Sequence, residues 1–195
     1  GALTGTLTAA QQAILASSGP GDLISKIKAP TLLLQGTVDV LFPLQQAITN
    51  AAMLQAVNTP VKMVWFCGGH GDCETPNDDN AAILAATMEW LDRWVMRKTT
   101  VDTGPKFEWI DQNGQYWSSE VLPTDTAFHG DSIPVSGTGG VLPIIPLVGS
   151  GPSTHVEFPY SIGDGEVASV AVNVPIEPGV AAQIVGSPTL TFSYS

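Results

Sequence analysis

In the first hundred positions, two mainly apolar runs are separated by a helical pattern of apolar residues. Residues 31–35 and 61–67 each follow a proline and are apolar without alternation, as expected of strands buried on both faces of a parallel sheet. Between them, apolar residues recur every three or four positions from Pro43 to about Asn58, which predicts an amphipathic helix. This part of the chain is therefore predicted to be α/β.

Two further helices are predicted on either side of this pattern. Thr8 suits the N-cap of a short helix that runs to about Ser18, where Gly19-Pro20-Gly21 stops it. A later helix repeats apolar residues at spacings of three and four between positions 83 and 95. Three basic residues near its end complement the helix dipole: Arg93, Arg97 and Lys98.

Beyond a polar link at residues 99–105 the pattern changes to strands and turns. Asn113-Gly114 separates short runs at 107–110 and 115–117, and it predicts a hairpin because both residues tolerate positive φ. Residues 167–175 and 188–195 alternate with period two, whereas residues 137–152 are rich in Gly and Pro and are expected to form a long surface loop.

We therefore predict two domains. Residues 1–101 form the C-terminal part of an α/β sheet domain, and residues 102–195 form an all-β, jelly-roll-like sandwich that is truncated. Gly1 begins without a signal-peptide pattern, and the last residues stop within a period-two strand pattern. We expect the chain to be a piece of a longer protein.

The composition of the chain disfavours several classes of function. The 195 residues include 44% hydrophobic residues, and 7 Lys plus Arg against 18 Asp plus Glu give a formal net charge of -11. Such a surface repels phosphate backbones and anionic headgroups, which disfavours nucleic-acid and peripheral-membrane roles. The most apolar stretches are too short for a membrane span, which needs about 20 residues.

Candidate catalytic residues follow the two buried strands. Asp39 comes after the first strand and His70 after the second, and loops at the carboxyl ends of parallel strands converge at one edge of the sheet. There His70 would act as the general base of a serine nucleophile, and Asp39 would hold its imidazole in the productive tautomer. We expect the two side chains to lie about 2.6 to 3.2 Å apart.

Several segments together carry a family resemblance. The segment IKAPTLLLQGTVD at 27–39, LFPL at 41–44, FCGGHG at 66–71 and the stretch 109–123 resemble the X-Pro dipeptidyl-peptidase and cocaine-esterase-like acyl hydrolases. The resemblance implies an α/β-hydrolase sheet followed by a jelly-roll domain. It also implies a serine hydrolase, either an acyl esterase or an X-Pro-type peptidase, that acts on a small acyl ester or peptide substrate without a cofactor or metal.

The nucleophile of such an enzyme is absent from this sequence. No G-x-S-x-G pentapeptide occurs, and Ser136 and Ser150 follow the histidine in a loop without strand-turn-helix context. The serine, the oxyanion hole and the first strands are therefore expected in an upstream segment of the same protein.

Less specific interpretations stay open beside this one. Asp39 can be a turn former, and the chain can be an inactive hydrolase-like module that binds a carbohydrate or a protein through Trp109, Tyr116 and Trp117. His129 and His155 are expected to be solvated loop residues. Four acidic residues are expected to be solvated and to cap the following helix: Asp72, Glu74, Asp78 and Asp79.

Cys67 and Cys73 flank His70, and three interpretations remain. With Asp72 they offer only three ligands, which is weak support for a structural zinc site. A disulfide would stiffen the His70 loop and require an oxidising compartment. Otherwise Cys67 is a buried strand residue and Cys73 a loop thiol.

Overall fold

The computed structural model describes residues 7–39, 41–70, 73, 79–111, 113–130, 155–157, 160–162, 185 and 191. The chain divides into two compact units, and the boundary that follows the main sheet lies between His129 and Gly130. The first unit contains a four-stranded sheet, and the second contains a two-stranded antiparallel sheet of β5 (His155–Glu157) and β6 (Tyr160–Ile162).

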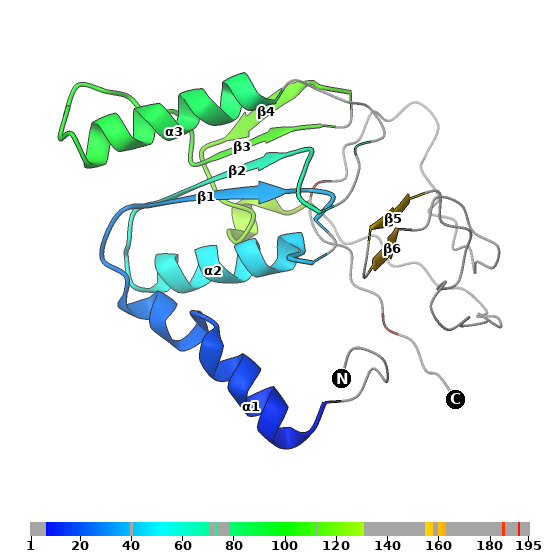
Figure 1. The fold of residues 1–195 in the computed structure, drawn as a ribbon. Coiled ribbons are helices and arrows are strands. Elements are labelled where there is room, and N and C mark those ends of the chain that lie inside the picture. Colours follow the sequence, from blue (N-terminus) through cyan, green and yellow to red (C-terminus); the bar gives the residue numbers. More distant parts are fainter. Residues whose placement is uncertain are drawn as a thin grey trace. The chain divides into compact units, whose positions relative to one another are not determined.

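Four strands form the main sheet, in the order β1-β2-β3-β4 (Figure 1). They are β1 (Thr31–Gly36), β2 (Val61–Phe66), β3 (Phe107–Ile110) and β4 (Tyr116–Ser119). The first three strands run parallel, and β4 returns antiparallel to β3. Gly114 supplies the positive φ of 75° in the turn between them, so the predicted hairpin is confirmed.

The predicted helices form within a few residues of their expected bounds. They are α1 (Ala9–Ser18), α2 (Leu44–Ala56) and α3 (Asn80–Trp94), with short 3-10 helices η1 (Gly21–Lys26) and η2 (Thr126–Phe128). Thr8 caps α1 through a reciprocal capping box with Gln11. Figure 1 shows α2 and α3 on opposite sides of the sheet, and β2 is buried along its length between them.

The sequence predicted that the hairpin would begin a second domain, but the hairpin belongs to the main sheet. Instead β3 pairs with β2, and Phe107 packs edge-on against Trp65 with ring centroids 4.7 Å apart. The compact units separate at Gly130 and not near residue 102. A hairpin pattern identifies two strands that pair with each other, but it contains no signal for the strand on the outer side of the pair.

Most of the expected sandwich lies outside the described residues. This applies to the loop at 137–152 and to the strand at 167–175, and only Thr191 is described in the strand at 188–195. The jelly-roll prediction therefore stays a prediction.

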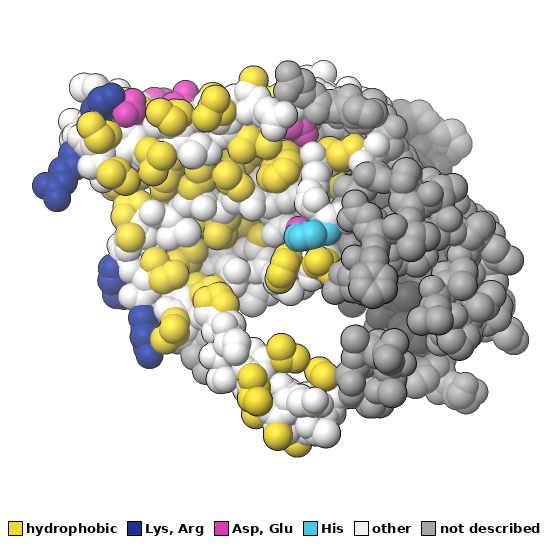
Figure 2. Space-filling model, viewed as in Figure 1, with side chains coloured by type: hydrophobic (Ala, Val, Ile, Leu, Met, Phe, Trp, Pro, Cys, Tyr) yellow, Lys and Arg dark blue, Asp and Glu magenta, His cyan; other side chains and the backbone are white. Residues whose placement is uncertain are grey.

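Apolar side chains are exposed on the edge strand β1 and on α3 in the described part of the chain. β1 was expected to be buried on both faces like β2, but its Leu34 is 41% exposed, and β1 forms an edge of the described sheet. Exposed apolar side chains also follow one row of α3 (Figure 2). They lie three and four residues apart: Leu84, Met88, Leu91 and Val95.

No helix among the described residues is long and apolar enough to cross a membrane.

Candidate catalytic site

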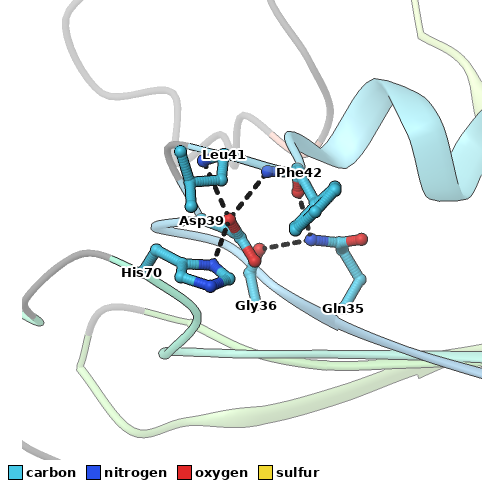
Figure 3. Close-up of polar contacts among 6 residues, drawn as sticks. All are labelled: Gln35, Gly36, Asp39, Leu41, Phe42 and His70. Carbon is cyan, nitrogen blue, oxygen red and sulfur yellow. Dashed lines mark hydrogen bonds and ion pairs between the residues drawn. The ribbon is translucent and has the colours of Figure 1, made fainter. Parts of the chain in front are cut away.

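Asp39 lies in the loop that follows β1, and its carboxylate is held by three donors. Its Oδ1 accepts hydrogen bonds from the backbone N–H groups of Leu41 at 3.0 Å and Phe42 at 2.8 Å, and it lies 2.9 Å from Nδ1 of His70 (Figure 3). Two of these donors are local, as in an Asp-stabilised turn. The third comes from His70 in the loop that follows β2, so the turn and the pairing with His70 exist together.

His70 lies beyond the end of β2 and remains accessible. Its side chain is 48% exposed, whereas that of Asp39 is 10% exposed. An ionised carboxylate can only accept, so Nδ1 of His70 carries a hydrogen and donates the hydrogen bond to Asp39. Whenever the ring is neutral, Nε2 is therefore its acceptor nitrogen. The expected approach of the two side chains is confirmed.

Backbone hydrogen bonds bring the two loops together. The ladder between β1 and β2 continues past the strands, because Thr37 donates to the carbonyl of Phe66 at 2.8 Å and Val38 to that of Gly68 at 3.3 Å. A Cβ on Gly36 would lie 2.1 Å from the Gly68 oxygen. The loops approach this closely only because Gly36 has no side chain.

Gly69 provides the second close approach. Its φ is 111°, and a Cβ at this position would lie 2.5 Å from Cβ of Asp39. Both the backbone conformation and the space therefore require glycine. His70, the next residue, is thereby placed directly over the Asp39 loop.

The site favours the ionised form of Asp39. The N–H of Phe42 is the largest influence that lowers the carboxyl pKa below its ordinary value of 3.8, and burial opposes it. The hydrogen bond from His70 and the N–H of Leu41 lower the pKa further. Asp39 is thus a carboxylate at neutral pH, the state that a base-orienting residue needs.

A disulfide closes the segment that carries His70. Cys67 and Cys73 are bonded, with Cα atoms 5.9 Å apart, so of the three interpretations the bridge is the one found. Both sulfurs are thereby withdrawn from metal binding. Within the described part of the chain, no cluster of three or more His, Cys, Asp or Glu is placed to hold a metal ion. Asp72, the third candidate ligand, lies outside the described residues.

Asp79 has a role that the sequence did not reveal. It occupies the N-cap position of α3 without capping the helix through its side chain. Instead it is buried, and its Oδ2 accepts the N–H of Cys67 at 2.9 Å. The expectation of a solvated cap is wrong here, and Asp79 fastens the start of the His70 segment to α3. The related predictions for Glu74 and Asp78 lie outside the described residues.

The other candidate residues do not join the site. His129 is exposed, as expected, whereas His155 lies in β5 and not in a loop. Ser136 and Ser150 lie outside the described residues. The sequence analysis missed two residues of the site, Gln35 and Phe42. The only sequence signal for Gln35 is a polar side chain at the end of an apolar run, and the only one for Phe42 is an aromatic side chain before Pro43.

The aromatic residues of the hairpin do not form one binding platform. Trp109 and Trp117 stack with ring centroids 6.5 Å apart. Tyr116 precedes Trp117 on β4 and so faces the other side of the sheet, where Glu108 and Glu89 raise its pKa after the larger effect of burial. This geometry weakens the interpretation of the chain as a carbohydrate-binding module through all three rings.

The site presents a carboxylate fixed by three donors and an accessible imidazole oriented by it. Comparisons of the chain with protein-family models, with curated proteins and with solved structures gave no match.

Proposed function

We propose that Asp39 and His70 are the acid and base of a Ser-His-Asp triad in a serine hydrolase. The single observation that carries this proposal is the hydrogen bond of 2.9 Å between Asp39 Oδ1 and His70 Nδ1, in a loop pair built to hold it. Its substrate would be a small acyl ester or an X-Pro-type peptide, in keeping with the resemblance to the X-Pro dipeptidyl-peptidase and cocaine-esterase-like acyl hydrolases.

The geometry supports defined roles for the two residues. Nε2 of His70 takes the proton of the serine hydroxyl as its oxygen attacks the acyl carbon, and then donates that proton to the leaving group. Asp39 stabilises the imidazolium that forms in between, and its lowered pKa keeps it ionised. A water molecule, activated by His70 in the same way, then hydrolyses the acyl-enzyme.

The nucleophile would come from polypeptide outside these 195 residues. The sequence contains no G-x-S-x-G pentapeptide, and the proposed fold is the C-terminal part of an α/β-hydrolase sheet. Two features support a missing part of the sheet beside β1: the exposed Leu34 on β1 and the exposed apolar row on α3. Upstream strands beside β1 would pair with its free edge, and the helices that connect them would cover exposed side chains of this kind.

Substitutions in the complete protein test the proposal. Asp39→Asn and His70→Gln should each lower hydrolysis of a panel of short acyl esters and X-Pro substrates by about 10⁴-fold, because each removes a member of the triad. The controls are His129→Gln and Asp92→Asn, which change the same residue types at exposed positions or in a surface ion pair. Their rates should stay at the wild-type level.

Covalent labelling gives an independent readout. An organophosphorus ester that phosphorylates activated serines should label the wild-type protein at one serine and should label the His70→Gln variant far more slowly. Full activity in both Asp39→Asn and His70→Gln would contradict the proposal. So would the absence of a labelled serine from an active wild-type protein.

A further inference from the structure

Gln35 closes the loop that carries Asp39. It is the residue of β1 before Gly36, and its Nε2 donates to two backbone carbonyls, that of Phe42 at 2.7 Å and that of Gly36 at 3.0 Å (Figure 3). These carbonyls belong to residues on either side of Asp39. One side-chain amide group therefore links the start of the loop to its end, and the hydrogen bond to Phe42 spans seven positions in the sequence.

Phe42, the residue held by Gln35, contacts both members of the proposed pair. Its N–H donates to Asp39 Oδ1 at 2.8 Å and is the largest influence that lowers the pKa of that carboxyl. Its ring lies 5.7 Å from the imidazole of His70, measured between centroids. The position of Phe42 thus affects both the carboxylate and the imidazole.

The chemistry of this bridge selects glutamine. The bridge needs two N–H donors at the end of a side chain of this length, because both partners are carbonyl acceptors. A glutamate has the same shape but would place a carboxylate against two carbonyl oxygens. A methionine would fill similar space and leave both carbonyls without this donor.

We propose that Gln35 is a positioning residue for the Asp39–His70 pair and acts through Phe42. This inference rests on the proposed function for its catalytic consequence. Without the Gln35 bridge, the Phe42 end of the loop is held less firmly, the N–H of Phe42 drifts from Asp39, and the imidazole loses its fixed orientation. Gln35 itself transfers no proton.

The test compares Gln35→Met and Gln35→Glu with the wild type in the complete protein. A matched control is Gln46→Met, the same chemical change at an exposed position of α2. In both Gln35 variants kcat should fall roughly 10- to 100-fold, since small misplacements of catalytic groups have effects of this size. KM should stay within about twofold, because both amide hydrogen bonds of Gln35 go to the chain's own backbone and the proposed role is positioning and not substrate binding.

A second readout needs no activity. Nuclear magnetic resonance of protein labelled at the aspartate carboxyl carbons should show the pKa of Asp39 rising toward its ordinary value in both Gln35 variants and unchanged in Gln46→Met. Among the described residues, His70 is the titratable group in contact with Asp39. The Nδ1 proton of His70, assigned by its loss in His70→Gln, should shift or broaden in the same two variants.

The outcomes separate the two proposals. An unchanged Asp39 titration and Nδ1 signal in both Gln35 variants would overturn the positioning role, whatever the activity. A shifted titration in a protein that hydrolyses no substrate even as wild type would overturn the proposed function and leave the positioning of Asp39 intact. If Gln35→Met fails to fold, Gln35→Leu, which also lacks the two N–H donors and adds no charge, decides the question through the same signals.

Discussion

Lys62 on β2 and Glu108 on β3 form a buried ion pair, with Nζ 2.6 Å from Oε1. Their side chains are 3% and 10% exposed, and Nζ also donates to the carbonyl of Thr103 in the link that precedes β3. The pair therefore fastens both the link and the hairpin to the parallel sheet. It lies across the position where the sequence pattern had suggested a domain boundary.

Breaking this pair on one side should destabilise the protein strongly. Lys62→Met leaves a buried carboxylate without its partner, and we expect a loss of about 3 to 5 kcal/mol in the free energy of unfolding, measured by urea titration. The control is Lys98→Met, which breaks the more exposed pair with Asp92 and should cost about 1 kcal/mol or less. The double variant Lys62→Met/Glu108→Leu should recover much of the loss. A Lys62→Met effect as small as that of the control would contradict the buried role.

Acidification should weaken the protein through two carboxylates. The pKa of Asp39 is lowered chiefly by the N–H of Phe42, and that of Asp111 chiefly by the indole N–H of Trp117. A native pKa below the unfolded value stabilises the protein above the unfolded pKa, and this contribution is lost as pH falls through the native pKa. Urea titrations from about pH 5 to about pH 3 should therefore show a steeper loss in the wild type than in Asp39→Asn or Asp111→Asn. Parallel pH curves for all three proteins would be inconsistent with these native hydrogen bonds.

The Cys67–Cys73 disulfide should stabilise the segment that carries His70. Because it closes a short loop, chain-entropy reasoning gives about 2 kcal/mol. Reduction, or the change Cys73→Ser, should lower the unfolding free energy by that amount and lower kcat, because His70 lies between the bonded residues. Mass measurement after alkylation, with and without reductant, reports the bridge directly. Two alkylated cysteines in the unreduced protein would show that the bridge does not form.

Residues 1–195 expressed alone should be insoluble or molten and hydrolytically inert. The exposed Leu34 at the edge of β1 and the apolar row on α3 would remain in water, and burying each such side chain is worth roughly 1.5 to 3 kcal/mol. We expect the outer edge of β1 to pair with upstream polypeptide in the complete protein. Dye binding to exposed apolar surface and thermal melting followed by circular dichroism measure this. A soluble monomer that melts cooperatively would contradict the expectation, and esterase activity from it would reveal an overlooked nucleophile.

The features that sequence predicted well are those with local causes. The cap at Thr8, the glycine turn at Gly114 and the helical spacing after Pro43 each depend on neighbours within a few residues. The meeting of Asp39 and His70 was also predictable, because parallel strands bring their following loops to one edge of the sheet.

The missed features depend on partners distant in the chain or specific to side-chain geometry. β3 joins β2 through residues more than forty positions away, such as Lys62 and Glu108, and no local pattern encodes that choice. The contact of Asp79 with the backbone of Cys67 and the bridge from Gln35 to Phe42 depend on how folded loops lie. An acidic residue before a helix and a polar residue at a strand end have the same appearance in sequence whether they are solvated or engaged.

The backbone ladder that extends beyond β1 and β2 has a consequence for motion. The amide hydrogens of Thr37 and Val38 are bonded to Phe66 and Gly68, so they can exchange with solvent deuterium only when the two loops part. Loops that are held only by side chains open locally at a low free-energy cost. Loops whose backbone hydrogen bonds continue a sheet open only together with that sheet. Thr37 should therefore exchange nearly as slowly as the amides within β2, which would make the Asp39 and His70 loops part of the same cooperative unit as the strands that precede them.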